Sequence, residues 1–212
     1  MVDPGPSYEV IERRVLAAGL SPVKPRREGA GAALAAGAGV AASIAVLAFA
    51  GVNASPGVVA LALLFVLTGA AAILFAVRLG TPAAALNPWA RRALEASPLV
   101  LLALAAFQRG HGLVWDLGAP SSPSCLLVGL LAAAPPVAAA AWVLAGGSPI
   151  VSWLAGALAG TGAGLLAGGM LHLHCPIGDL SHVVPFHGGV ILVAALAAAA
   201  VNVAVWRARG RG

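Results

Sequence analysis

Residues 150–171 read IVSWLAGALAGTGAGLLAGGML, and no residue in this stretch is charged. About 20 mostly apolar residues suffice for a helix to cross the ~30 Å hydrocarbon core of a membrane. Glycine recurs at every fourth position along the stretch, at Gly156, Gly160, Gly164 and Gly168. Positions four apart share one helix face, and small residues there let helix backbones approach closely in lipid. The stretch therefore predicts a transmembrane helix that packs tightly against a neighbour.

Apolar stretches of similar length occur along most of the chain. Of its 212 residues 60% are hydrophobic and 9% are charged, whereas a soluble domain carries roughly 25% charged residues. We expect an all-α bundle of six transmembrane helices at Ala30–Val52, Pro56–Val77, Leu94–Val114, Pro123–Ala145, Ile150–Leu171 and Val184–Trp206. This divides the chain into a cytoplasmic segment (1–29) with a short helix, a transmembrane domain (30–206) and a basic cytoplasmic tail (207–212).

The third span is the least apolar of the six. Only Pro98–Phe107 is continuously apolar, because the span also contains Glu95, Ser97, Gln108 and Arg109. Its charged side chains must therefore extend to the two membrane interfaces. The basic residues nevertheless favour this span. With six spans and a cytoplasmic N-terminus, all 12 Lys and Arg residues except Arg109 lie inside, as the positive-inside rule requires. Without the third span, the three arginines of the C-terminal tail would face outward.

This pattern predicts a multi-pass protein of the bacterial inner (cytoplasmic) membrane with both termini in the cytoplasm. The net charge of +5 does not indicate nucleic-acid binding, because the basic residues lie at the ends of apolar stretches. The lipid bilayer is therefore the expected partner of this surface.

Both cysteines and all five histidines fall on the outer side in this topology. Thiolate and imidazole suit zinc, copper or nickel, although the spacing matches no zinc motif. The candidate ligands of a divalent metal such as zinc are Cys125, His172, His174, Cys175, His182 and His187. Alternatively, Cys125 and Cys175 form a redox-sensitive disulfide in an oxidising compartment. In a third interpretation, these are merely small and interfacial residues.

The N-terminal segment contains a possible partner-binding motif. Ser7 can cap a short helix on which Tyr8, Ile11 and Val15 form an apolar stripe. Such a stripe can bind in the groove of a cytoplasmic partner. A helix resting on the bilayer, or a segment without structure, is the alternative.

Enzyme chemistry has little support in the sequence. All seven acidic residues map to the tail, the loops or the span ends, and HExxH, Walker A and CxxC patterns are absent. We therefore expect a protein that is not an enzyme. An integral-membrane redox or metal-dependent enzyme that uses the outer Cys/His residues, or a purely structural subunit, remains the alternative.

The C-terminal half resembles the NrsF-like family of polytopic membrane anti-sigma factors, which are negative regulators of extracytoplasmic-function sigma factors. The residues that carry this resemblance are Pro123-Ser124-Cys125, Pro135-Pro136, Ser148-Pro149, the glycine-rich span Gly156–Gly168, His174-Cys175-Pro176 and Phe186-His187. It covers residues 120–206 best. The N-terminal half agrees in layout only, with a short helix and a Pro22-Val23-Lys24 linker before the apolar spans.

The resemblance implies a protein that holds an extracytoplasmic-function sigma factor at the membrane until a stress signal arrives. The two cysteines of the family would correspond to Cys125 and Cys175. The chain is richer in histidine than expected, and Phe186 replaces an expected tryptophan. We therefore expect an outer oxidant or metal signal whose identity the sequence leaves open.

Overall fold

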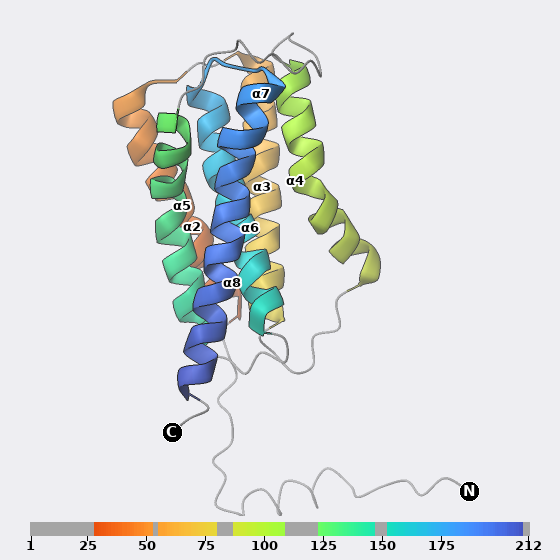
Figure 1. Ribbon diagram of the computed structural model, residues 1–212, viewed down its shortest axis with the longest axis vertical. Coiled ribbons are helices and arrows are strands. Elements are labelled where there is room, and N and C mark those ends of the chain that lie inside the picture. The colour runs from red at the N-terminus through yellow and green to blue at the C-terminus, as the bar shows by residue number, and fades with distance from the viewer. Residues whose placement is uncertain (1–27, 53–54, 80–86, 109–122, 147–151, 210–212) are drawn as a thin grey trace, which may run out of the picture.

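The computed structural model describes residues 28–52, 55–79, 87–108, 123–146 and 152–209, and this part of the chain is helical with no strand. The all-α expectation is thus confirmed. The elements are α2 (Glu28–Ala50), α3 (Pro56–Arg78), α4 (Pro88–Gln108), α5 (Pro123–Ala145), α6 (Ser152–His174), α7 (Leu180–His182), the π-helix η1 (Val183–Gly188) and α8 (Gly189–Arg209). The long helices run side by side as one bundle (Figure 1).

Five segments of the described chain are long and apolar enough to cross a membrane. They are Gly29–Phe49, Pro56–Arg78, Pro123–Ala145, Trp153–His174 and Leu180–Ala208. Helix α4 is a sixth long helix beside α3, but it is not one of the five. The structure thus contains six long helices, of which five have the length and composition of a membrane span.

Helix α4 begins at Pro88, earlier than the expected start at Leu94. The Asn87 side chain accepts a hydrogen bond from the Trp89 N–H at 2.9 Å, as a helix cap does. Arg91 and Glu95, one turn apart, form an ion pair at 2.7 Å. The polar residues Asn87, Arg91 and Glu95 therefore stabilise the first turns of α4. The predicted start at Leu94 was too late because it relied on apolar residues alone. The described helix ends at Gln108, and the rest of the expected span lies outside the described residues.

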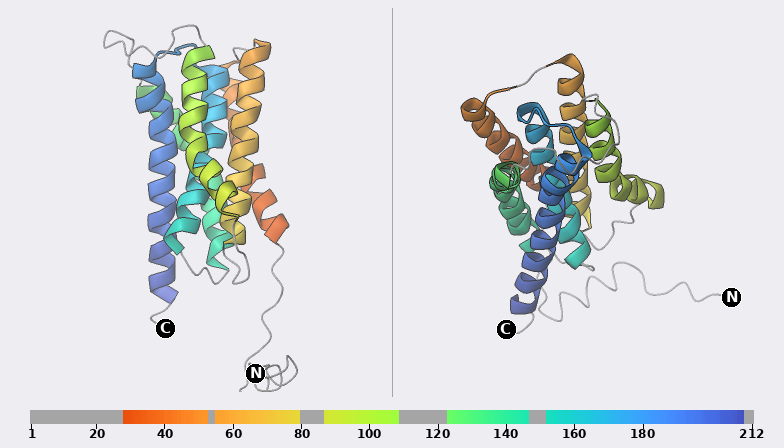
Figure 2. Two further views of the ribbon diagram at one scale, coloured as in Figure 1. Left: turned by 90° about the vertical axis from the view of Figure 1, so that its right-hand side faces the viewer. Right: turned by 45° about the horizontal axis from the view of Figure 1, so that its top comes forward.

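Helix α6 occupies the centre of the bundle (Figures 1 and 2). Of its most apolar 18-residue stretch 83% is buried, against 39% or less in the other four candidate spans. Three of its regularly spaced glycines face α8. A Cβ atom added at Gly156 would lie 2.6 Å from the Ala198 carbonyl oxygen, and Gly160 and Gly164 meet the α8 backbone in the same way. The predicted tight packing is confirmed for these three glycines.

The other face of α6 packs on α3 through one glycine from each helix. A Cβ atom at Gly69 of α3 would lie 2.7 Å from the Gly162 carbonyl oxygen, and one at Gly162 would lie 2.5 Å from the Gly69 carbonyl oxygen. Gly168, the fourth glycine of the regular series, faces the Phe65 ring of α3 instead of α8. Helix α6 therefore has backbone contact with two neighbours at once.

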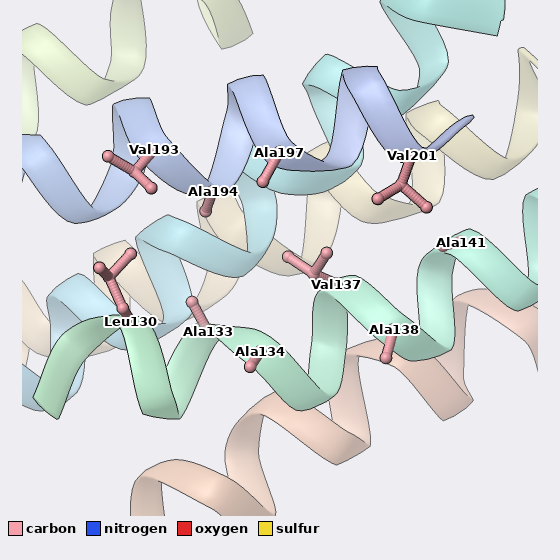
Figure 3. Close-up of a pocket in the computed structure, with 10 residues that line it drawn as sticks. All are labelled: Leu130, Ala133, Ala134, Val137, Ala138, Ala141, Val193, Ala194, Ala197 and Val201. Carbon is pink, nitrogen blue, oxygen red and sulfur yellow. The ribbon is translucent and has the colours of Figure 1, made fainter. Parts of the chain in front are cut away.

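Helix α5 continues through Pro135 and Pro136, two adjacent residues of a type that ordinarily kinks or breaks a helix. The helix is not broken there. Pro136 is buried, and a Cβ atom added at Gly39 of α2 would lie 3.3 Å from its ring. Between α5 and α8 lies a groove of roughly 340 Å³ (Figure 3). Only Leu, Ala and Val side chains line it, so it offers lipid or another apolar surface a place to pack but no chemistry.

The last span differs most from expectation. The sequence predicted one α-helix from Val184 to Trp206, whereas the structure has the short helix α7, the six-residue π-helix η1 and then α8. The turn Cys175–Asp179 joins α6 to α7. This turn, the start of α5 and the end of α6 lie at one end of the bundle, which we call the cysteine end (Figure 1). The end of α8 lies at the opposite end.

Candidate functional site

The two cysteines meet at the cysteine end of the bundle. Cys125 lies in the first turn of α5, and Cys175 directly follows α6, where its N–H donates to the Leu171 carbonyl at 2.7 Å. Their Sγ atoms are 3.7 Å apart, and no disulfide bond joins them. Cys175 is buried, whereas Cys125 is half-buried. The sulfurs are thus in contact without being bonded, since a disulfide bond is about 2.05 Å long.

Two histidines complete the surroundings of the thiols. The His182 Nε2 atom lies 3.4 Å from the Cys175 Sγ atom. The rings of His182 and His187 are 5.3 Å apart and nearly perpendicular, and the Phe186 ring lies 5.0 Å from that of His182. Both histidines are buried, with 0% and 3% of their surfaces exposed. Their side chains therefore face the thiols and not solvent or lipid.

The π-helix explains why these two histidines face the same way. Residues five apart on an α-helix point about 140° apart, because each residue turns the helix by about 100°. In a π-helix the backbone hydrogen bonds join residues five apart, so such residues lie nearly above one another. His182 precedes Val183, the first residue of η1, and His187 lies in its last turn. The wider winding between them brings the two imidazoles together.

Together these four residues form one compact group, which we call the Cys/His cluster: Cys125, Cys175, His182 and His187. One ligand atom from each lies within 4.8 Å of all the others, so the group can hold a metal ion. It contains no carboxylate. Thiolate and imidazole donors favour zinc, copper and other thiophilic ions over calcium or magnesium. The two adjacent thiols can alternatively join as a disulfide.

The two remaining candidate ligands of the sequence analysis lie outside the cluster. The His172 Nε2 atom is 2.8 Å from the Gln108 Oε1 atom of α4, and the His172 ring stacks on Phe65. The His174 Nδ1 atom lies 3.3 Å from the Gly51 carbonyl oxygen. Sequence alone could not separate these four histidines, because the π-helix is not visible in it. Gln108 was likewise expected only to be a polar residue at the end of a span, with no contact to a histidine.

The proposed partner-binding residues Tyr8, Ile11 and Val15 lie outside the described residues, as does the fifth histidine, His111. The described basic residues are at the ends of helices far from the cluster. Arg78 ends α3, Arg91 lies in the first turn of α4, and Arg207 lies near the end of α8. The cluster and these charges therefore occupy opposite ends of the bundle (Figure 1).

Comparison with protein families matches residues 16–207 to the family described as negative regulator of sigma F, NrsF. The match covers nearly the whole chain. This chain is a member of the NrsF family. No match was found among curated proteins or among solved structures. As an NrsF-family member the chain is a negative regulator with a sigma factor as its partner. The match begins after Tyr8, Ile11 and Val15, so it does not bear on that stripe.

Proposed function

We propose that this NrsF-family protein is a membrane-bound anti-sigma factor that holds an extracytoplasmic-function sigma factor and releases it when an oxidant or a thiophilic metal reaches the Cys/His cluster. One observation carries the sensory part: two thiols whose sulfur atoms are 3.7 Å apart lie beside two buried imidazoles. Thiols in such surroundings react with oxidants and bind metals. The family membership supports the regulatory part and weighs against the rival, a membrane redox or metal-dependent enzyme.

We infer the orientation from charge. The described arginines lie at the end opposite the cluster, and positive charge marks the cytoplasmic side. The cluster then faces the periplasm of a bacterial inner membrane, and both termini face the cytoplasm. In this arrangement Tyr8, Ile11 and Val15 lie on the side where a sigma factor is found, and they can bind it through their apolar stripe.

A disulfide between the two cysteines would convert an oxidant signal into a change in the bundle. Its formation removes two electrons and two protons from Cys125 and Cys175, and an oxidant in the periplasm accepts them. The sulfurs must move from 3.7 Å to about 2.05 Å apart. Cys125 begins α5 and Cys175 follows α6, so the bond would tie the start of one membrane helix to the end of the other. Both helices run the length of the bundle, so a change in how they pack can reach the cytoplasmic end.

The experiment co-expresses the tagged full-length chain with each extracytoplasmic-function sigma factor of its source genome and purifies it in detergent. We expect one sigma factor to be captured from reduced membranes and to be released after treatment with diamide. A chain that captures no sigma factor would contradict the regulatory proposal. Capture that diamide and cadmium leave unchanged would contradict the sensory part.

A further inference from the structure

Two distances around Cys175 in the Cys/His cluster correspond to edges of a coordination tetrahedron. Zinc binds sulfur at about 2.3 Å and imidazole nitrogen at about 2.0–2.1 Å. Tetrahedral angles then place two sulfurs about 3.8 Å apart and a sulfur and a nitrogen about 3.6 Å apart. The Cys125 and Cys175 Sγ atoms are 3.7 Å apart, and the Cys175 Sγ atom is 3.4 Å from the His182 Nε2 atom. Two of the donor–donor distances, both at the Cys175 sulfur, thus already match coordination spacing, and the remaining ones are at most 4.8 Å.

The π-helix supplies the fourth donor. No ligand atom in the cluster is more than 4.8 Å from another, so side-chain movements of about 1 Å would bring His187 into the first coordination shell. Had η1 continued as an α-helix, His187 would point away from His182. Pro185, which has no N–H to donate, lies within the π-helical turn. Short π-helical turns inside α-helices occur frequently at functional sites.

The charge of the donor set selects the type of ion. A divalent ion that displaces the two thiol protons would leave two thiolates, two neutral imidazoles and no net charge. Neutrality matters because Cys175, His182 and His187 are buried, and an uncompensated charge there would be costly. A closed set of four protein ligands is typical of structural or regulatory zinc and not of catalytic zinc, which keeps one position open. Half-buried Cys125 provides the side from which an ion can enter.

We propose that the Cys/His cluster is a closed tetrahedral site for one zinc-type d¹⁰ divalent ion, with Cys125, Cys175, His182 and His187 as its ligands. This names the ligand of the site that the proposed function treats as sensory, and it rests on that function only for its role. A bound ion holds the start of α5, the end of α6 and η1 together. It also keeps the two thiols reduced until the ion is lost or exchanged.

The experiment uses the full-length reduced protein in detergent micelles without oxygen and titrates it with Co²⁺, a spectroscopic substitute for zinc. We expect one Co²⁺ per chain, with the intense visible bands of tetrahedral cobalt, thiolate-to-metal charge transfer, and stoichiometric displacement by Zn²⁺. His187→Ala should weaken binding at least about tenfold and should remove the tetrahedral bands. His174→Ala is the matched control at the same end of the bundle, and it should bind as the parent does.

A second variant separates coordination from folding. His187→Gln keeps a polar side chain of similar length but removes the imidazole, so it should unfold like the parent and yet bind Co²⁺ as weakly as His187→Ala. Parent protein that fails to bind one Co²⁺ tetrahedrally, or a His187→Ala variant that binds like His174→Ala, would overturn the proposal. Sigma-factor capture is measured on the same preparations. Capture without metal binding overturns only the site, whereas metal binding without capture overturns only the regulatory function.

Discussion

Cys175 is the residue on which the Cys/His cluster is centred. Its Sγ atom lies 3.7 Å from the other thiol and 3.4 Å from the His182 Nε2 atom, and its backbone N–H closes the last turn of α6. It therefore contributes to both chemical possibilities, disulfide and metal. Cys125 approaches from a different helix and is more accessible. An oxidant or an incoming ion thus meets Cys125 first.

Serine at either cysteine should abolish the response to oxidants with little effect on folding. Serine is close to cysteine in size, but it cannot form the sulfur–sulfur bond. We expect the Cys125→Ser and Cys175→Ser variants to capture the sigma factor from reduced membranes and to retain it after diamide treatment. Thermal unfolding in detergent serves as the folding control. If a variant with both cysteines replaced by serine released the sigma factor like the parent, the two cysteines would have only a packing role.

Gly160 offers a test of packing at the residue scale. A Cβ atom there would collide with the backbone of Ala194 and Ala195, which cannot move without shifting α8. We expect Gly160→Ala to lower the free energy of unfolding by about 1–3 kcal/mol. Gly37→Ala is the matched control, because a Cβ atom at Gly37 of α2 would meet nothing within 4 Å. That change should be neutral or stabilising by up to about 1 kcal/mol. Equal effects in thermal unfolding would contradict the close approach of α6 and α8.

At the scale of the elements, α4 is the helix least bound to the bundle. The half before Pro98 bends away from the other helices (Figures 1 and 2). A groove of roughly 520 Å³ lies between α4, η1 and α8. The half after Pro98 is held at the cysteine end. There the Gln108 side chain is hydrogen-bonded to His172, and Leu102 packs beside Gly188 of η1. Helix α4 therefore touches the π-helix that carries His187 and extends toward the opposite end.

Reporter fusions can establish whether α4 crosses the membrane. With six spans, fusions after Thr81 and at the C-terminus report the cytoplasm, and fusions after Ser55, Ala119 and Ile177 report the periplasm. If α4 stays on one side, the fusions at Ala119 and Ile177 both switch to the cytoplasm. We expect the six-span result, because it leaves the basic residues at one side. A cytoplasmic signal at Ala119 would contradict the periplasmic position of the Cys/His cluster.

At the scale of the whole molecule, sensing and partner binding are proposed at opposite ends. The Cys/His cluster lies at one end of a helix bundle roughly as long as a membrane is thick, since α5 and α6 each have 23 residues. The N-terminal segment precedes α2, whose first residue is Glu28 at the other end (Figure 1). Any signal must therefore travel along the helices, and the central helix α6 has backbone contact with both α3 and α8.

Deleting residues 1–20 should abolish sigma-factor capture and leave membrane insertion intact, because every candidate span remains. Replacing Ile11 and Val15 together by Asp should have nearly the same effect, since two charges would be buried in an apolar groove. Co-purification measures capture, and membrane fractionation measures insertion. If both variants captured the sigma factor normally, the sigma-factor contact would have to lie in residues 78–92 instead.

The properties that could be predicted from the amino-acid sequence are those that depend on composition and local period. Long uncharged stretches, glycine at every fourth position and arginines at their ends predicted helices, a tight α6 interface and the membrane character of the chain. The motifs around Cys125 and Cys175 sufficed for the family. Hydrophobicity and spacing are local quantities, so they can be read without knowledge of the fold. Tyr8, Ile11 and Val15 remain a prediction from such local patterns.

Which of the candidate ligands meet could be seen only in the folded chain. His172 and His174 are nearest to Cys175 in sequence, yet they contact Gln108 and Gly51, while His182 and His187 face the thiols. The reason is geometric. The direction of a side chain depends on the winding of its own helix, and a π-helical turn changes that direction. The approach of Cys125 to Cys175, 50 positions apart, depends in turn on how α5 and α6 pack.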